Sequence, residues 1–125
     1  MIRQLGVFYA FSFITGGILG FVPAVTVNEM FLGVFKVNPL HSALHLVSGV
    51  IFLIACLVGA WVVRLWFQVF GLAYGALAAW GFFVGDGMIC GLITNNSNDS
   101  WGHAGLALSM LLIGFASAKP VPARA

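Results

Sequence analysis

Long apolar stretches separated by short, more polar segments dominate the chain. Four of these stretches approach the roughly 20 residues that a helix needs to cross the hydrocarbon core of a bilayer. They cover residues 5–25, 40–63, 65–84 and 101–118. Because hydrocarbon offers no hydrogen-bond partner to a backbone N–H or C=O, a crossing segment must satisfy these groups within itself. The stretches lack the alternation of apolar and polar residues that marks a membrane strand, so the pattern predicts four transmembrane helices.

Composition agrees with a membrane protein and narrows the class further. Of the 125 residues, 62% are hydrophobic and only 6% are charged, which lies far outside the range of soluble globular proteins. The formal net charge of +2 is too small and too scattered to indicate a nucleic-acid partner. We therefore predict an all-α fold, a single four-helix transmembrane bundle that covers residues 1–125 and lies in the lipid bilayer.

The positive charges predict the orientation of this bundle. Cytoplasmic ends of membrane helices carry an excess of lysine and arginine. Four basic residues fall at the ends that four spans would bring to one face, and a single one falls at the other face. The four are Arg3, Arg64, Lys119 and Arg124, and the single one is Lys36. We therefore expect both termini in the cytoplasm, and the three histidines on or near the outer side.

The second half of the chain repeats a pattern of scarce residues found in the first half. The matches at an offset of 58 positions are Met30 and Met88, Gly33 and Gly91, Asn38 and Asn96, and His45 and His103, with His41 meeting Asp99. Upstream, an offset of 61 pairs Arg3 with Arg64, Gly20 with Gly81, and Phe21 with Phe82. We interpret the chain as two helical hairpins in tandem, related by a pseudo-twofold axis along the membrane normal. That geometry would bring the two copies of the motif together.

Each copy of the motif predicts the start of a helix. Asn38 can cap a helix with its side-chain oxygen, and Pro39 suits the first helical position because the N–H that it lacks would be unpaired there. His41 and His45 then lie one turn apart on the same face. In the second copy, Asp99 near the helix start also complements the helix dipole.

The six polar residues of the two motifs form the candidate functional cluster. His45 lies about six residues into its helix, on the order of 9 Å below the helix start, and His103 is expected at a similar depth. A polar side chain at this depth is costly unless it faces the protein and finds a partner. The cluster comprises Asn38, His41, His45, Asn96, Asp99 and His103.

Three interpretations of this cluster stay open at the level of sequence. The first is a set of ligands for zinc, copper or non-haem iron, or for a haem held by a histidine from each of two helices. The candidate ligands are His41, His45, Asp99 and His103. No Cys-x-x-Cys or Glu-x-x-His pattern strengthens this interpretation, so no cofactor is favoured. The second is hydrogen bonding that joins helices, and the third is a pathway for protons or a small solute.

Four stretches carry a resemblance to a known family. They are LGVFKVNPLHSALHLVSGV, RLWFQVFGLAYG, GFFVGDG and NNSNDSWGH. In this order and spacing the chain resembles, over nearly its whole length, the small bacterial membrane proteins labelled domain of unknown function 4383. The resemblance implies four helices and a bacterial membrane, and it implies no reaction. The chain departs from the family pattern at Trp101 and Gly102, where members usually carry a leucine before the histidine, and we expect looser packing there.

The expected function follows from what the sequence contains and what it lacks. The sequence has no Ser-His-Asp or Cys-His arrangement with a supporting motif, no phosphate-binding loop and no dinucleotide fingerprint, so we expect no enzyme. We predict a structural or accessory role in the bacterial inner membrane, in association with another copy or a larger membrane complex. The alternatives are a haem- or metal-binding redox protein that uses His45 and His103, and a transporter of a small solute or of protons.

Small residues and cysteines add two further predictions. Small residues spaced four apart favour close contact between helices, either within the bundle or between copies of the chain. Such pairs are Gly16 and Gly20, Gly71 and Gly75, and Gly81 and Gly85.

Cys56 falls towards the cytoplasmic end of the second span and Cys90 falls in an outer loop. The two cysteines therefore cannot form a disulfide with each other in this topology.

Overall fold

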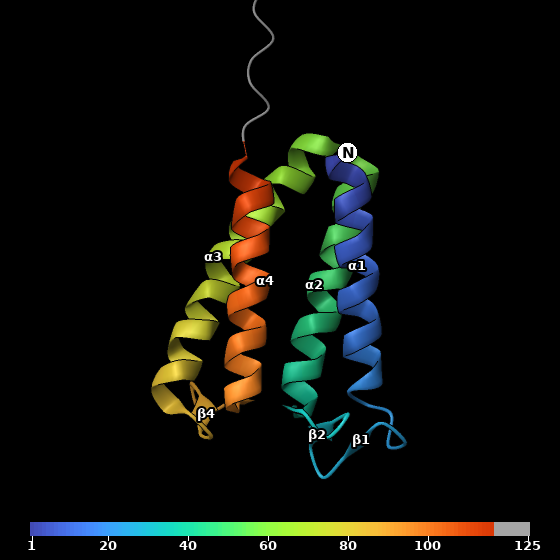
Figure 1. The fold of residues 1–125 in the computed structure, drawn as a ribbon. Coiled ribbons are helices and arrows are strands. Elements are labelled where there is room, and N and C mark those ends of the chain that lie inside the picture. Colours follow the sequence, from blue (N-terminus) through green and yellow to red (C-terminus); the bar gives the residue numbers. More distant parts are fainter. Residues whose placement is uncertain (117–125) are drawn as a thin grey trace, which may run out of the picture.

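Four α-helices form the main body of the computed structural model, which describes residues 1–116 (Figure 1). They are α1 (Ile2–Leu19), α2 (Pro39–Val58), α3 (Ala60–Val84) and α4 (Ser97–Phe115). α1 packs against α2, and α3 packs against α4. Within the described residues, α1, α2 and α3 are each long and apolar enough to cross a membrane. The prediction of a mostly helical chain is therefore confirmed, with three helices suited to a bilayer.

The first helix ends earlier than the first apolar stretch. α1 ends at Leu19, whereas the predicted span continues to residue 25. Beyond the helix the chain turns, with Phe21 N–H donating to the Ile18 carbonyl (2.9 Å) and Val22 N–H to the Leu19 carbonyl (3.1 Å). Pro23 follows and supplies no N–H for another helical hydrogen bond. The predicted boundary was wrong because apolar residues continue past the helix into these turns.

The boundary between the second and third helices also differs from the prediction. The predicted spans meet at Arg64, whereas the helices meet at Gly59, which has an extended backbone (φ 161°, ψ 166°) that ends one helix before the next begins. Residues 60–63 therefore belong to α3. Arg64 lies inside α3, where its Nη1 donates to the Ala116 carbonyl beyond the end of α4 (2.7 Å). The sequence predicts this boundary at a charged residue, whereas Gly59 ends α2 in the structure.

The fourth helix begins earlier than predicted, and its first turn is more polar than the predicted span. The predicted span covers residues 101–118, whereas α4 starts at Ser97 with the polar turn Ser-Asn-Asp-Ser. α4 is not among the helices of residues 1–116 that are apolar enough to cross a membrane by composition alone. The predicted end of this span at residues 117 and 118, and the basic residues Lys119 and Arg124, lie outside the described residues.

Two small β-ribbons, which were not predicted, connect the paired helices. One has the strands β1 (Thr26–Val27), β2 (Met30–Phe31) and β3 (Phe35–Lys36) in antiparallel order, and the other pairs β4 (Met88–Ile89) with β5 (Ile93–Thr94). Leu32 and Gly33 between β2 and β3 have positive φ (53° and 69°), as do Cys90 and Gly91 between β4 and β5 (54° and 66°). Such hairpin turns favour glycine, which explains why glycine recurs in both copies of the motif.

Glycines let the paired helices approach each other closely. A Cβ added at Gly17 of α1 would lie 2.7 Å from the backbone nitrogen of Leu46 in α2. In the other pair, a Cβ added at Gly71 of α3 would lie 2.7 Å from a side-chain carbon of Leu111 in α4. Gly16, which was expected to make such a contact, has no atom within 4 Å of an added Cβ. Gly20, the other member of the predicted pair, does approach α2 closely, because a Cβ added there would meet the Ser42 side chain.

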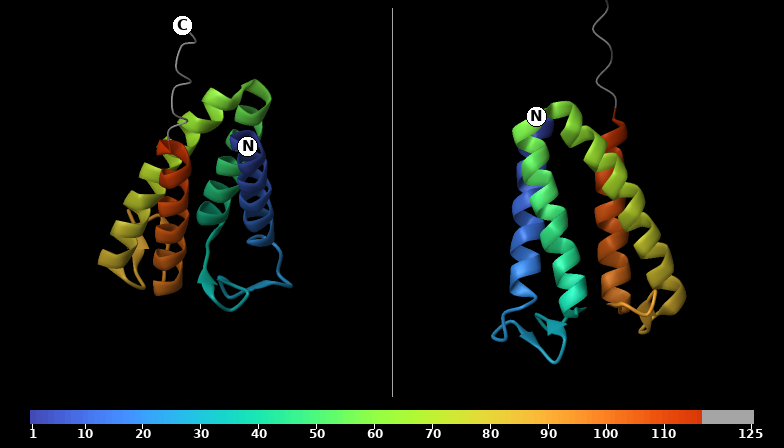
Figure 2. Two further views of the ribbon diagram at one scale, coloured as in Figure 1. Left: turned by 45° about the horizontal axis from the view of Figure 1, so that its top comes forward. Right: turned by 180° about the vertical axis from the view of Figure 1, so that it is seen from behind.

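The molecule has two distinct ends (Figure 2). The amino terminus, the α2–α3 connection at Gly59 and the end of α4 lie at one end, and both ribbons lie at the other. Arg3 and Arg64 consequently belong to the first end, whereas Lys36 belongs to the ribbon end. Because α2 and α4 begin at the ribbons, the candidate cluster lies at the ribbon end.

Candidate functional site

The two asparagines of the cluster cap the helices that carry the histidines. The Asn38 side chain accepts a hydrogen bond from the His41 N–H at the start of α2 (2.8 Å). At the start of α4, the Asn96 side chain accepts one from the Asp99 N–H (2.8 Å), and the Asp99 carboxylate accepts one from the Asn96 N–H in return (2.9 Å). This exchange is a capping box. The caps fix where each helix begins and hence which face carries the residues that follow.

The same asparagines also join the two ribbons in a reciprocal way. Asn38 Nδ2 donates to the Leu92 carbonyl in the turn between β4 and β5 (2.8 Å). Asn96 Nδ2 donates to the Val34 carbonyl in the turn between β2 and β3 (3.0 Å). Asn96 follows Asn38 by 58 positions, as Leu92 follows Val34. Each asparagine thus holds its own helix and the turn of the opposite ribbon.

A second pair of contacts is exchanged in the same way. His41 Nδ1 lies 3.1 Å from the Thr94 carbonyl oxygen, and Asp99 Oδ2 accepts a hydrogen bond from the Lys36 N–H (3.1 Å). Asp99 follows His41 by 58 positions, as Thr94 follows Lys36. Because a carbonyl oxygen only accepts, the contact with Thr94 requires a proton on His41 Nδ1. The neutral His41 ring then carries its lone pair on Nε2.

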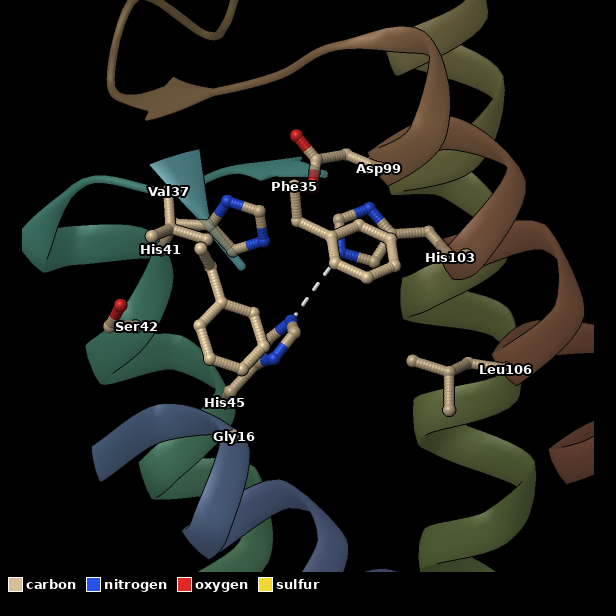
Figure 3. Close-up of a pocket in the computed structure, with 11 residues that line it drawn as sticks. Gly16, Phe35, Val37, His41, Ser42, His45, Asp99, His103 and Leu106 are labelled. Atoms are coloured by element: carbon tan, nitrogen blue, oxygen red, sulfur yellow. Dashed lines mark hydrogen bonds between the residues drawn. The ribbon is translucent and has the colours of Figure 1, made fainter. Parts of the chain in front are cut away.

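Three histidines converge beside these contacts (Figure 3). One ring nitrogen from each of His41, His45 and His103 lies within 4.8 Å of the other two. The Nε2 atoms of His45 and His103 are 3.4 Å apart. His41 and His103 are buried, with 1% and 3% of their surface exposed. The structure thus brings the histidine pair of α2 together with the single histidine of α4.

A cavity of about 280 Å³ lies against the three histidines. Asp99 lines it as well, together with apolar side chains that include Phe35 and Leu106 (Figure 3). Two residues that line the cavity, Ser42 and His103, each carry a buried polar atom (Oγ and Nδ1) that has no hydrogen-bond partner within residues 1–116. Leaving a buried polar atom unpaired costs about 1–3 kcal/mol. Ser42 Oγ packs against Gly20, since a Cβ added there would meet it, so His103 Nδ1 is the unpaired polar atom among the three histidines.

Tyr74 and Ser48 adjoin the histidines, and sequence reasoning missed this connection. The Tyr74 ring centre lies 5.8 Å from that of His45 and 5.5 Å from that of His103. Its hydroxyl lies 2.9 Å from the hydroxyl of Ser48, and both residues are 1% exposed. The two side chains come from different helices, so no local spacing could have paired them.

Asn95 is a second residue that sequence reasoning missed. It is fully buried, and its Nδ2 donates to the carbonyls of Gly81 (3.2 Å) and Gly85 (2.7 Å) at the end of α3. The same nitrogen lies 3.0 Å from Ser100 Oγ. Asn95 therefore joins the end of α3 to the first turn of α4. In the sequence it is one of three asparagines within the stretch TNNSN, and its partners lie 5–14 positions away.

Comparison with known proteins places the chain in a family. The chain matches no curated protein and no solved structure. A family model matches residues 3–116, which include both ribbons, all six residues of the candidate cluster and nearly all of the four helices. This match confirms the family resemblance that the four sequence stretches indicated. The chain therefore belongs to the family described as Domain of unknown function (DUF4383).

Proposed function

We propose that this chain is a small integral membrane protein with a structural or accessory role, built from two tandem helical hairpins joined at the outer face of a bacterial inner membrane. In this proposal all four helices cross the bilayer and both termini are cytoplasmic. α4 is included because its 19 residues extend about 28 Å at 1.5 Å per residue, close to the hydrocarbon thickness. Its polar first turn lies at the ribbon end, where the membrane surface would be.

The reciprocal contacts between the two motifs carry this proposal. In a duplicated hairpin with twofold pseudo-symmetry, contacts from the first copy to the second are expected to recur with the two copies exchanged. Two sets of contacts meet this expectation at the offset of 58. They are Asn38 to Leu92 with Asn96 to Val34, and His41 to Thr94 with Asp99 to Lys36. The polar groups of the motifs are used to hold one half of the molecule against the other.

Two arginines at the opposite end support the proposed orientation. Arg3 Nη2 donates to the Cys56 carbonyl near the end of α2 (2.7 Å), and Arg64 Nη1 donates to the Ala116 carbonyl beyond α4 (2.7 Å). A cation at the carboxyl end of a helix complements the helix dipole. Positive charge at this end also agrees with the cytoplasmic excess of lysine and arginine in membrane proteins.

The outward faces of the helices support association within the membrane. Large apolar side chains are widely exposed on the helices, among them Phe83 (89%) and Leu57 (78%). Such surfaces suit lipid or another membrane protein. We favour this role over solute transport, because transport sites lie near the bilayer midplane on interrupted helices and the polar cluster lies at one end of α2 and α4. The proposed partner is another copy of the chain or a subunit of a larger complex.

Native mass measurement tests the accessory role. Protein extracted in a mild detergent, with lipid retained, should give masses above that of a single 13.3 kDa chain. The same preparation in a strongly dissociating detergent serves as the control and should return the single chain. Cross-linking in the intact membrane should trap the same partner. A single chain in every mild detergent, with no cross-linked product in the membrane, would contradict the accessory role.

A further inference from the structure

The spacing of His45 and His103 matches that of metal ligands, and His41 lies close to both. Zinc binds imidazole nitrogen at about 2.0–2.1 Å, so two such ligands at a tetrahedral angle lie about 3.3–3.4 Å apart. The Nε2 atoms of His45 and His103 are 3.4 Å apart. The ligand nitrogen of His41 lies within 4.8 Å of both. A ring movement of about 1–2 Å would bring it to the same spacing.

Hydrogen bonding around the His41 ring also resembles that of a metal site. A metal-bound histidine usually donates its other ring N–H to a carboxylate or a backbone carbonyl, which fixes the tautomer and the ring orientation. His41 makes this contact with the Thr94 carbonyl through Nδ1, and its Nε2 is left with the lone pair. Asp99 lies one turn before His103 on α4 and lines the same cavity. Its carboxylate accepts from the backbone N–H groups of Lys36 and Asn96, and His103 Nδ1 has no hydrogen-bond partner within residues 1–116.

The cavity adds two features to the three neutral imidazoles, namely space for a fourth ligand and an acidic side chain. Zinc sites with three histidines keep a fourth position open to water or to a ligand. The cavity lies against all three histidines and provides space for that fourth ligand. Asp99 is the acidic residue on the cavity lining, and in weakly polar surroundings a carboxylate attracts a dication strongly. The site therefore combines three nitrogen ligands with one nearby negative charge.

A haem fits this arrangement less well than a single ion. Two histidines that hold a haem iron must leave a flat slot for the porphyrin between their rings. The His41 ring lies beside both members of the pair, with ring centres 4.9 Å from His45 and 5.2 Å from His103. Three rings in mutual contact thus surround a point, where a bare ion can bind.

We propose that His41, His45 and His103 bind one divalent transition-metal ion, with a fourth coordination position open to the cavity beside Asp99. The ligands define the class of ion, because imidazole suits Zn²⁺, Cu²⁺ and Ni²⁺, whereas Mg²⁺ and Ca²⁺ prefer oxygen. This site is independent of the accessory role proposed above, so either proposal can fail without the other.

The test uses the full chain, purified in detergent through an affinity tag that contains no histidine. After incubation with Zn²⁺ and removal of free ion, elemental analysis should find a single zinc per chain. Zn²⁺ at one hundred times its Kd should raise the unfolding temperature by about 5–10 °C. His45→Ala and His103→Ala should lose both the bound zinc and this rise. Asp99→Asn, which keeps an oxygen to cap α4, should weaken binding by about tenfold.

Cys90→Ser is the matched control, because Cys90 is an exposed thiol that can bind Zn²⁺ by itself. This variant should retain the zinc. Wild-type protein that binds neither Zn²⁺, Cu²⁺ nor Ni²⁺ stoichiometrically, and whose unfolding temperature they do not raise, would overturn the proposal even if the histidine variants fail to fold. Zinc that stays bound in a folded His45→Ala, His103→Ala double variant would overturn it too. A haem Soret band in the purified protein would also overturn the proposal, because the site would then hold a haem and not a bare ion.

Discussion

At the residue scale, Asn38 makes two contacts that substitution can separate. Alanine at this position removes both the cap of α2 and the hydrogen bond to the Leu92 carbonyl, which should lower the free energy of unfolding by about 2 kcal/mol. Serine keeps an oxygen that can cap the helix but is too short to reach Leu92. Asn38→Ser should therefore lose about 1 kcal/mol. Unfolding in detergent, followed by circular dichroism, measures both losses.

Asn96 provides the comparison for this experiment. Asn98 Nδ2 also donates to the Val34 carbonyl that Asn96 contacts (3.0 Å). Because this second donor remains after substitution, Asn96→Ser should cost less than Asn38→Ser. A larger loss at Asn96 would contradict the assignment of the two contacts.

Residue types that are scarce in this chain made the cluster predictable. Asparagine and histidine recur at one offset, at which His41 also meets Asp99, and the structure brings His45 and His103 together across that offset. Tyr74 and Ser48 do not belong to this repeat. They lie 26 positions apart on two different helices. Sequence reasoning therefore found the residues that repeat and missed the partners that only folding brings near.

At the scale of elements, two neighbouring glycines of α1 should respond in opposite ways to alanine. A Cβ at Gly17 would meet the backbone of Leu46, which cannot move aside without separating α1 from α2. Gly17→Ala should therefore lower the free energy of unfolding by about 1–3 kcal/mol. Gly16 opens on the cavity, with no atom within 4 Å of an added Cβ. Gly16→Ala should gain up to about 1 kcal/mol of helix propensity.

Gly105 of α4 serves as a second control, since an added Cβ there also meets no atom within 4 Å. Thermal unfolding of the three alanine variants in one detergent gives the comparison. Gly17→Ala should be the least stable of the three. If Gly16→Ala were less stable than Gly17→Ala, the packing face of α1 would have to be rotated from the one described here.

The ends of elements were less predictable than their existence, for two physical reasons. Apolar residues continue into the turns after Leu19, so hydropathy does not change where the helix stops. The ribbons have two-residue strands, which are too short to show an alternating pattern. Their turns carry Leu32 and Cys90 before glycine, where the usual signal for such a hairpin is Asn-Gly or Asp-Gly.

At the scale of the whole molecule, one numerical relation links sequence and structure. The offset of 58 that pairs the two motifs in the sequence also separates His45 from His103, which meet in space, and relates the two exchanged asparagine contacts. The proposed duplication would explain both observations with one event, whereas unrelated halves would need each contact to arise separately. At the opposite end Arg3 and Arg64, which are 61 positions apart, make a similar pair of contacts, because each binds a carbonyl near or beyond the end of α2 or α4.

The proposed orientation of the whole molecule can be tested with its own two cysteines. Cys90 is exposed at the ribbon end, whereas Cys56 is buried near the opposite end. If the ribbons face outwards, a membrane-impermeant maleimide should label spheroplasts at Cys90, and Cys90→Ser should abolish the label. Labelling that requires an opened membrane would place the ribbons in the cytoplasm. Because Arg3 and Arg64 lie at the end away from Cys90, that result would also mean that these charges do not set the orientation of this protein.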